Sequence, residues 1–249
     1  MKDYIGEIVA NKQIAPDAYC ITIEVKNMPE VRPGQFAMLE VPREDCILRR
    51  PFGVLSHDEN NVSFLYQIKG KGTDALTMLE VGDNIKLAFP LGNGFPLGGE
   101  KKIAVVGGGF GIVPLYSVAD CYRGAEVRIY NGFASEGKVM LEREFGKLGK
   151  LTVCTDDGSR GFHGYPVAAL ERDMDDGFAP ETIFCCGPEP LMKSVKAFAT
   201  RRGVKAYLSL EQRMGCGIGA CLTCTCKADG HNKRVCKDGP VFESTEVFE

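Results

Sequence analysis

The sequence predicts a multidomain protein of α+β and α/β class, with an N-terminal β-barrel, a doubly wound α/β domain and a short C-terminal cysteine module. Three observations support this division. Strand-like runs separated by turns fill the first part of the chain, strands then alternate with helices, and cysteines crowd the last part. The predicted domains are residues 1–98, 99–208 and 209–249.

The predicted barrel rests on three strand-like runs, at residues 19–25, 35–41 and 62–68, with turn-forming residues between them. Short strands at this spacing are typical of a small barrel. One short helix is predicted from Thr73 to Glu80, because its apolar residues have helical spacing. Residues 90–99 are rich in Gly and Pro and predict the domain boundary.

The predicted α/β domain begins with the continuous apolar run at residues 103–106, which is typical of a strand buried on both faces. Further strands are predicted at residues 127–130, 151–154 and 182–186. A helix is predicted from Pro190 to Arg202, with Pro at its start and Gly203 after its end. Alternation of this kind predicts a doubly wound sheet.

Composition and charge exclude several functional classes. The chain has 249 residues and a net charge of −3, and no basic tract predicts nucleic-acid binding. No apolar run reaches the length of a transmembrane helix, so no membrane association is predicted. Eleven cysteines without a secretion signal fit a reducing compartment, and we therefore expect a cytoplasmic protein.

Five of the eleven cysteines lie between Cys216 and Cys236, and four of them have the spacing Cys216-x4-Cys221-x2-Cys224-x11-Cys236. The first three spacings match the plant-type ferredoxin pattern of an iron–sulfur cluster. Glycines alternate through this segment and allow backbone N–H groups to approach anionic sulfur atoms. Zinc is the alternative metal, although zinc sites usually show two short Cys pairs. The fifth cysteine, Cys226, is interpreted as a bystander.

A glycine-rich turn follows the first strand of the α/β domain, at Val106-Gly107-Gly108-Gly109-Phe110-Gly111-Ile112-Val113-Pro114. Such a turn lets a pyrophosphate approach the backbone and the positive end of a helix, or it simply packs a strand against a helix. Two other loops follow strands of the same domain, and they contain Asp156, Asp157 and Gly158, and Cys186, Gly187 and Pro188. All three loops are expected at one edge of the sheet, where a nicotinamide dinucleotide would bind.

The barrel contains two candidate phosphate-binding segments. Two arginines precede Pro51 in Leu48-Arg49-Arg50-Pro51-Phe52-Gly53, and a guanidinium can grip a phosphate with two hydrogen bonds. Gly70-Lys71-Gly72-Thr73 precedes the short helix, where the N–H groups and the hydroxyl can bind phosphate or cap the helix. Solvated arginines and an ordinary Thr cap are the alternatives.

The order of these motifs resembles the ferredoxin–NADP reductase superfamily, in which the barrel binds FAD and the α/β domain binds the nicotinamide. The segment from Met214 to Cys224 makes the resemblance more specific. The whole chain is similar to the electron-transfer subunits of class 1B dihydroorotate dehydrogenases. The resemblance implies three cofactors, FAD, a [2Fe–2S] cluster and NAD. No side chain is predicted to act as a catalytic acid or base.

The resemblance also implies the binding residues. The flavin would contact residues of the barrel, namely Arg50, Pro51, Phe52, Gly53, Tyr66, Gln67, Ile68, Gly72 and Thr73. The dinucleotide would contact Gly107, Gly108, Gly109, Gly111 and Pro114 together with the loops at Asp156–Gly158 and Cys186–Pro188. The cluster would be held by Cys216, Cys221, Cys224 and Cys236. Gly53 stands where the superfamily usually has Ser or Thr, so a hydroxyl contact to the flavin is missing or is supplied by the backbone.

The expected function is the transfer of electrons from the FMN of a dihydroorotate-oxidising partner to NAD⁺, in pyrimidine biosynthesis. The resemblance implies a heterotetramer with two chains of each kind. The alternative is an FAD/[2Fe–2S] subunit of a ferredoxin:NAD(P) oxidoreductase or of a sulfide-type dehydrogenase. Tyr130-Asn131-Gly132-Phe133 offers neither a ribose-binding acid nor an arginine for a 2′-phosphate, so the choice of NAD rests on the resemblance.

Overall fold

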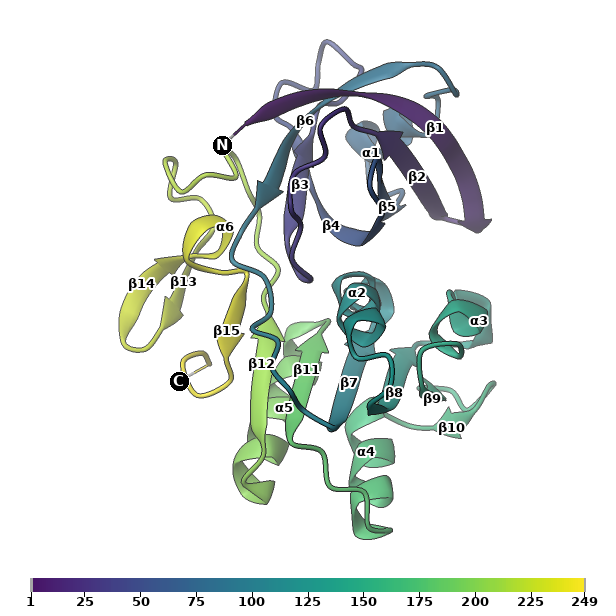
Figure 1. Cartoon of the computed structure of the whole chain (residues 1–249), viewed down its shortest axis with the longest axis vertical. Coiled ribbons are helices and arrows are strands. Elements are labelled where there is room, and N and C mark those ends of the chain that lie inside the picture. The colour runs from purple at the N-terminus through teal and green to yellow at the C-terminus, as the bar shows by residue number, and fades with distance from the viewer. Residues whose placement is uncertain (1, 249) are drawn as a thin grey trace. The chain divides into compact units, whose positions relative to one another are not determined.

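The computed structural model describes residues 2–248 and divides the chain into two compact units (Figure 1). The first unit consists of residues 1–94, 211–226 and 232–240, and the second consists of residues 95–210, 227–231 and 241–249. Much of the cysteine segment therefore groups with the barrel. The division into three domains at residues 98 and 208 stays a prediction.

The first unit contains a closed barrel, in the spatial order β1-β2-β5-β4-β3-β6. The strands are β1 (Asp3–Ala15), β2 (Ala18–Glu24), β3 (Phe36–Leu39), β4 (Arg50–His57), β5 (Asn61–Gln67) and β6 (Asn84–Leu91). The predicted β2, β3 and β5 are confirmed. The other three were not predicted individually, because β1 carries many exposed polar residues, β4 contains Pro51 and Gly53, and β6 runs into Pro90 and the Gly- and Pro-rich segment after it.

The barrel interior is filled by alternate residues of its strands. On β2, Ile21 and Ile23 are completely buried, and Phe64 on β5 is buried and meets Phe89 of β6 edge to face. Burial of one such side chain contributes roughly 1.5–3 kcal/mol, so this apolar interior is the main source of the barrel's stability.

Helix α1 (Lys71–Leu76) is shorter than predicted and ends at Leu76 instead of Glu80. The carboxamide of Asn11, on β1, donates hydrogen bonds to the carbonyl oxygens of Leu76 and Leu79, at 2.9 and 3.0 Å. These carbonyls therefore have partners outside the helix, and the chain leaves the helical path there. A contact between residues so distant in sequence was not visible in the apolar spacing.

The second unit is built on a seven-stranded sheet, in the order β10-β9-β8-β7-β11-β12-β15. The strands are β7 (Lys102–Gly108), β8 (Glu126–Phe133), β9 (Lys150–Thr155), β10 (Phe162–His163), β11 (Thr182–Cys186), β12 (Lys205–Ser209) and β15 (Val241–Glu243). All neighbours are parallel except β12 and β15. The predicted doubly wound sheet is confirmed, and the strand order reverses between β7 and β11.

Helices connect the parallel strands. They are α2 (Val113–Cys121), α3 (Glu142–Phe145), α4 (Pro166–Asp175) and α5 (Glu189–Arg202), with the 3₁₀ turns η1 (Gly109–Ile112) and η2 (Glu136–Lys138). On β8, Tyr130 and Gly132 face α4, because Tyr130 bonds Asp173 of that helix and Pro166 would touch a Cβ at Gly132. Asn131 lies between them and faces the opposite side of the sheet, toward η1.

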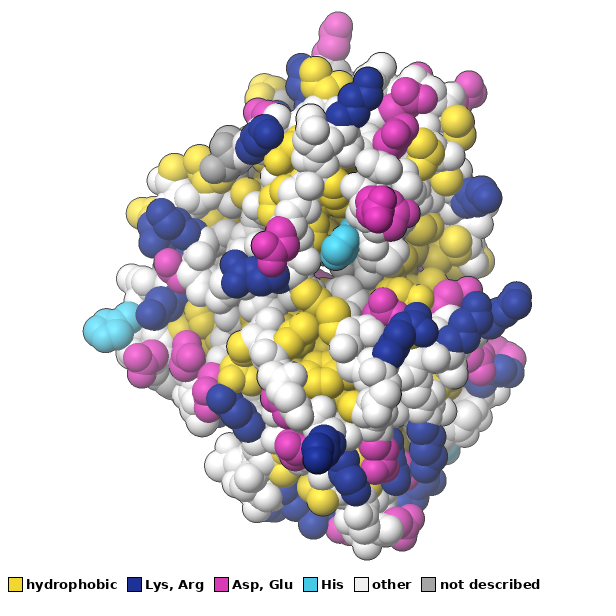
Figure 2. Space-filling model, in the orientation of Figure 1, with side chains coloured by type: hydrophobic (Ala, Val, Ile, Leu, Met, Phe, Trp, Pro, Cys, Tyr) yellow, Lys and Arg dark blue, Asp and Glu magenta, His cyan; other side chains and the backbone are white. Residues whose placement is uncertain are grey.

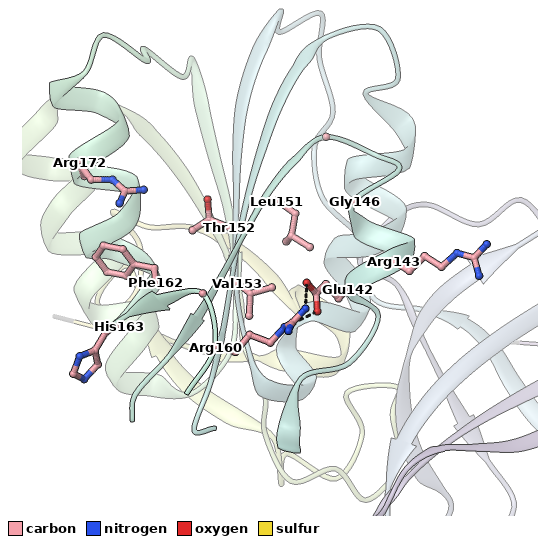
Figure 3. Close-up of a pocket in the computed structure, with 12 residues that line it drawn as sticks. Glu142, Arg143, Gly146, Leu151, Thr152, Val153, Arg160, Phe162, His163 and Arg172 are labelled. Atoms are coloured by element: carbon pink, nitrogen blue, oxygen red, sulfur yellow. Dashed lines mark hydrogen bonds and ion pairs between the residues drawn. The ribbon is translucent and has the colours of Figure 1, made fainter. Parts of the chain in front are cut away.

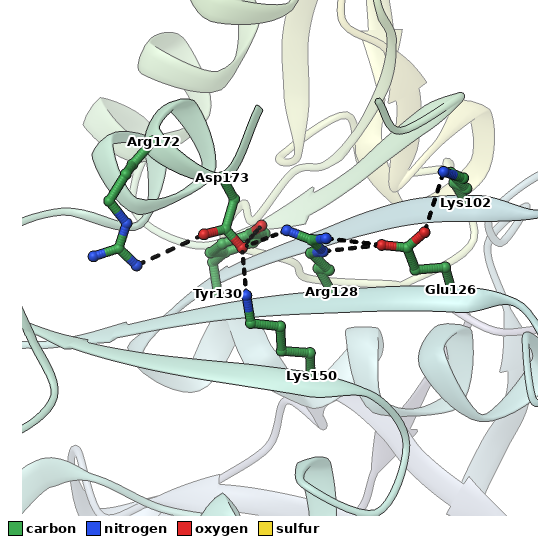
Figure 4. A network of polar contacts seen from close by, with 7 residues as sticks. All are labelled: Lys102, Glu126, Arg128, Tyr130, Lys150, Arg172 and Asp173. Carbon is green, nitrogen blue, oxygen red and sulfur yellow. Dashed lines mark hydrogen bonds and ion pairs between the residues drawn. The ribbon is translucent and has the colours of Figure 1, made fainter. Parts of the chain in front are cut away.

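A buried carboxylate joins α4 to this sheet (Figure 4). Asp173 is 4% exposed and accepts hydrogen bonds from Arg128 (2.9 Å), the Tyr130 hydroxyl (3.0 Å) and Lys150 (3.2 Å). Burial opposes ionisation, but Arg128 and Lys150 outweigh it and hold the pKa of Asp173 below its ordinary value. The network is structural, because all of its charges are directed at one another.

The cysteine segment forms the strands β13 (Thr225–Ala228) and β14 (His231–Arg234), which pair with each other, and the helical turn α6 (Val235–Asp238). No helix within residues 2–248 is long and apolar enough to cross a membrane. On the face shown in Figure 2, basic and acidic side chains are interspersed with apolar ones.

Candidate cofactor-binding sites

The four predicted cluster cysteines lie together in the first unit, as two thiol pairs. The N–H of Cys221 donates to Cys216 Sγ, and the N–H of Cys236 donates to Cys224 Sγ, each at 3.4 Å. The structure therefore brings together cysteines from both ends of the x11 spacing, which sequence alone could only propose.

Backbone N–H groups point at these sulfur atoms. Cys216 Sγ lies 3.3–3.4 Å from the backbone nitrogens of Ile218, Ala220 and Cys221. The loop curls around the sulfur through Gly217 and Gly219, whose φ angles of 71° and 82° favour glycine. Three donors on one sulfur match an anionic thiolate, so the donor set fits the sulfur ligands of an iron–sulfur cluster.

The loop also changes the acidity of individual thiols. The hydroxyl and N–H of Thr223 lower the pKa of Cys221 to about 6. Burial raises the pKa of Cys236 to about 12, with a further contribution from Cys224. Burial also raises the pKa of the fifth thiol, Cys226, which is half-buried. Within residues 2–248, no three His, Cys, Asp or Glu side chains converge as a single metal ion requires.

The barrel supports this loop at close range. A Cβ on Gly217 would lie 2.5 Å from Cγ of Met38, and one on Gly92 would lie 2.5 Å from Cδ of Pro240. The N–H of Asn93 also donates to the carbonyl oxygen of Gly239 at 2.8 Å. Both ends of the cysteine segment are therefore packed on β3 and on the chain that follows β6.

The two predicted phosphate-binding segments of the barrel meet at Arg50. A Cβ on Gly72 would lie 2.9 Å from Nε of Arg50, so only glycine leaves room for the guanidinium above the start of α1. Nη1 of Arg50 also donates to the carbonyl oxygen of Leu48. A guanidinium beside free helix N–H groups fits a phosphate of a flavin dinucleotide.

The neighbouring polar groups are already engaged. Arg49 forms a two-pronged ion pair with Asp3, at 2.6 and 3.3 Å, so the two arginines do not act together. The hydroxyl of Thr73 accepts from the N–H of Lys69 at 2.8 Å and donates to the carbonyl oxygen of Gly70 at 3.1 Å. Thr73 thus closes the turn before α1 with its side chain.

The other predicted flavin contacts differ in how accessible they are. Tyr66 is 1% exposed, donates its hydroxyl to Asn11 at 3.2 Å and stacks on Tyr19, so its side chain belongs to the barrel core. Gln67 donates to Asp17 at 2.6 Å. Phe52, Gly53, Pro51 and Ile68 are only partly buried. Pro51, Phe52 and Gly53 follow Arg50 on β4, and the ring of Phe52 lies 5.7 Å from that of Tyr66 on the neighbouring strand β5.

In the second unit, the glycine turn and the loop after β11 touch each other. Cys186 pairs in register with Gly107, and a Cβ on Gly111 would lie 2.5 Å from the carbonyl oxygen of Cys186 and from Cα of Gly187. Pro188 lies 3.0 Å from the place of a Cβ on Gly108. The two loops therefore meet where the strand order reverses, which is the usual nucleotide position in an open α/β sheet.

One polar residue at this turn was not predicted as a site residue. Asn131 is 1% exposed, and its Oδ1 atom lies 3.1 Å from the place of a Cβ on Gly107 and has no hydrogen-bond partner. An unpaired buried acceptor costs about 1–3 kcal/mol. The signal in the sequence was a single Asn within the otherwise apolar run Ile129-Tyr130-Asn131.

The predicted loop at Asp156–Gly158 lies at the same edge of the sheet but is separated from the glycine turn by β8. Asp157 accepts hydrogen bonds from the N–H and the hydroxyl of Ser159, at 3.0 and 2.6 Å. The N–H of Asp156 donates to Phe133 at 3.0 Å. This loop therefore borders the end of β8.

Known proteins are similar to this chain over nearly its whole length. The model of the iron–sulfur cluster binding domain of dihydroorotate dehydrogenase B matches residues 211–248. A dihydroorotate dehydrogenase B (NAD⁺) electron transfer subunit from Clostridium acetobutylicum is 40% identical, over 98% of this chain and 96% of its own. One from Enterococcus faecalis is 36% identical, over 99% and 98%. The chain belongs to the family of dihydroorotate dehydrogenase B electron transfer subunits.

Solved structures agree with this family. The structure of an NADH-dependent reduced ferredoxin–NADP oxidoreductase has a TM-score of 0.87 and 29% identity, and the alignment covers 98% of this chain and 89% of that one. A cytochrome b5 reductase domain from Ulva prolifera nitrate reductase, at 18% identity and a TM-score of 0.66, shares the fold. The predicted family, fold class, electron-transfer role and cofactors agree with these comparisons.

A cavity of about 1130 Å³ lies at the β10 edge of the sheet, beside β9 and β10 (Figure 3). None of the predicted site residues lines it. Arg160 points at Glu142 and forms a two-pronged ion pair with it, at 3.0 and 2.9 Å. This pair neutralises two of the charges that line the cavity, and none of the lining residues belongs to the glycine turn.

Proposed function

We propose that this chain is the electron-transfer subunit of an NAD⁺-dependent dihydroorotate dehydrogenase. It would pass electrons from the FMN of a dihydroorotate-oxidising partner, through a [2Fe–2S] cluster and FAD, to NAD⁺. Dihydroorotate loses two electrons and two protons, NAD⁺ takes two electrons and one proton, and the second proton goes to solvent. The observation that supports this most strongly is the group of four thiols within the segment that matches the family's cluster-binding domain.

Cys216, Cys221, Cys224 and Cys236 are the proposed cluster ligands. The loop around Cys216 supplies N–H groups that stabilise negative charge on sulfur, and the barrel holds the loop through Gly217 and Met38. A flavin can exchange electrons in pairs with a nicotinamide and singly with a cluster, which is why both groups are needed.

Arg50 and the N–H groups at the start of α1 are proposed to hold the flavin's phosphates. The contact between the guanidinium and the bare Cα of Gly72 supports this, because it places a fixed cation at a helix N-terminus. Phe52 is partly buried and offers an aromatic ring beside this position. Gly53 has no hydroxyl, so any hydrogen bond from this residue would come from its backbone.

The turn at Gly107–Gly111 is proposed to hold the pyrophosphate of NAD, with Gly187 and Pro188 on its other side. Absence of side chains lets the backbone approach the ligand, and the positive end of η1 and α2 favours an anion. The chain's residues bind and orient the dinucleotide. No proton needs to be moved by a side chain, so rate depends mainly on positioning.

The family's name implies a catalytic partner subunit. We propose that the partner carries FMN, that the two chains form a heterotetramer with two copies of each, and that the complex acts in the cytoplasm. The described residues form a six-stranded closed barrel and a seven-stranded sheet, and neither is the (β/α)₈ barrel expected of a dihydroorotate-oxidising chain.

The test is co-expression with the candidate catalytic chain, followed by assays of each chain alone and of both together. Dihydroorotate-dependent NADH formation is expected only with both chains. Formation of NADH by this chain alone would contradict the proposal.

A second function is favoured by one observation, the TM-score of 0.87 to an NADH-dependent reduced ferredoxin–NADP oxidoreductase. In that case the chain would serve a larger flavoprotein that handles ferredoxin and NADP(H). Stable co-purification with such a subunit, without dihydroorotate activity, would favour this alternative.

A further inference from the structure

An ion pair lies beside the proposed cluster ligands, between Arg234 and Asp238. Asp238 Oδ2 accepts from the N–H of Arg234 at 2.7 Å and from its Nε at 2.9 Å, and Oδ1 accepts from Nη2 at 2.9 Å. Both side chains are about one-third exposed or less, at 33% and 27%. The pair therefore has the fixed geometry that loose surface ion pairs lack.

This pair spans the short helical turn α6, which carries Cys236. Nη1 of Arg234 reaches the carbonyl oxygen of Gly219 at 3.5 Å, and a Cβ on Gly219 would lie 3.4 Å from Cδ of Arg234. One arginine thus contacts both the loop that contains Cys216 and Cys221 and the turn that contains Cys236. It joins the two halves of the cysteine segment.

The two charges of the pair lie next to the proposed ligands. Arg234 and Asp238 flank Cys236 on the turn, each two residues from it. Arg234 also reaches Gly219, in the loop between Cys216 and Cys221. Both charges therefore lie close to the cysteine segment, and each partly screens the other.

We propose that Arg234 and Asp238 form a positioning pair that sets the reduction potential of the cluster, with Arg234 raising it and Asp238 lowering it. The inference rests on the proposed function only in that it requires a [2Fe–2S] cluster on the four cysteines. One-electron reduction adds one negative charge to the site without making or breaking a bond. A neighbouring cation stabilises this charge and a neighbouring anion destabilises it, and net charge near a cluster is known to shift its potential.

The test of this proposal is the direction in which each variant shifts the reduction potential. If the pair only held the loop in place, breaking it from either side would have similar effects. If charge matters, Arg234→Gln lowers the potential, because the Asp238 carboxylate is left unbalanced. Asp238→Asn raises it, because the guanidinium is left unbalanced. Arg234→Lys keeps the positive charge but loses the two-pronged contact of the guanidinium with Asp238. It should leave the potential close to that of the unaltered protein.

The experiment is a redox titration of the full-length protein, followed by the electron paramagnetic resonance signal of the reduced cluster. Iron, sulfide and FAD are measured first for every variant. Lys237→Gln is the matched control, since it removes one positive charge from the same turn at an exposed position, where water and salt screen it. It is expected to shift the potential less than Arg234→Gln does.

Opposite shifts in Arg234→Gln and Asp238→Asn, with a normal cluster content, support the proposal. Shifts in the same direction, no shift in either variant, an equal shift in Lys237→Gln, or loss of the cluster from both variants would overturn it. An unaltered protein without iron and sulfide would instead refute the proposed function itself, so the two failures are distinguishable.

Discussion

The cysteine segment and the glycine turn organise their binding groups in opposite ways. Three of the four proposed cluster ligands lie within nine residues, and local N–H groups already surround Cys216. The turn at Gly107–Gly111 depends on Cys186 and Gly187, which come from a distant strand of the same sheet. A site made of local ligands can be identified from spacing, whereas a site made of loops that meet in space needs the fold.

The largest expected effect tests the local site. Cys224→Ser should abolish the cluster, because Cys224 is buried beside Cys236 and a hydroxyl is a poor ligand for iron in a sulfide cluster. Cys226→Ser is the matched control and should retain full iron and sulfide. Both contents and the visible spectrum are measured after anaerobic purification. Retention of the cluster by the first variant and its loss from the second would reverse the ligand assignment.

The buried ion-pair network around Asp173 stabilises the α/β unit without any cofactor, and Asp173→Asn tests this contribution. Removing this charge takes one ionic partner from Lys150 and one from Arg128, which keeps Glu126. We expect a loss of about 2 kcal/mol in unfolding free energy, below the value for a fully buried pair because Lys150 is 61% exposed. Denaturant unfolding measures this loss. The control is Asp175→Asn, which breaks an exposed ion pair with Arg202 and should lower the unfolding free energy much less.

The same carboxylate predicts a dependence of stability on pH. The pKa of Asp173 in the folded protein lies below its ordinary value of 3.8. Its contribution is therefore fully present above about pH 4 and is lost as the pH falls through the folded pKa. The stability difference between the unaltered protein and Asp173→Asn should shrink in acid, and a difference that grows on acidification would contradict the ion-pair account.

The flavin site is expected to respond to one arginine and not to its neighbour. Arg50→Ala should weaken FAD retention by roughly 10- to 100-fold, the value of one or two hydrogen bonds to a charged group. Arg49→Ala should leave retention unchanged, because Arg49 is held by Asp3. Flavin content after extensive dialysis reports the effect. Equal losses from the two variants would remove Arg50 as the specific contact.

The smallest expected effect tests the site built from distant loops. A methyl group on Gly111 would collide with the backbone at Cys186 and Gly187, so Gly111→Ala must displace one of the two loops. We expect about 10-fold weaker NADH binding, with FAD and cluster content unchanged. Gly137→Ala is the control, since nothing lies within 4 Å of its Cβ position. Unchanged NADH affinity in Gly111→Ala would show that the ligand binds elsewhere.

The sequence predicts features that depend on neighbouring residues better than features that depend on residues far apart in the chain. The strands β2, β5, β7 and β11 were predictable from apolar runs, and the proposed cluster ligands were chosen from their spacing. β1 was not predictable, because a strand with many exposed polar residues has no strong pattern. β6 was not, because it contains Pro90 and runs into the Gly- and Pro-rich segment after it. Helix α1 ends early because Asn11 bonds its last carbonyl groups, and Arg49 is held in an ion pair by Asp3. Contacts of this kind join residues far apart in sequence.

Asn131 illustrates the same limit within the dinucleotide site. Its residue type was noted in the sequence only as the absence of a ribose-binding acid. The structure adds that its Oδ1 atom is buried next to Gly107 without a partner. Burial and lack of a partner are both properties of the fold, and no spacing rule predicts them.

The measurement that tests the central claim most directly is anaerobic addition of NADH to this chain alone, purified with stoichiometric FAD and cluster. The account predicts rapid bleaching of the flavin absorption, followed by the electron paramagnetic resonance signal of a reduced [2Fe–2S] cluster. A protein that carries both cofactors and shows neither change with NADH would contradict the proposed path of electrons between the dinucleotide, the flavin and the four cysteines.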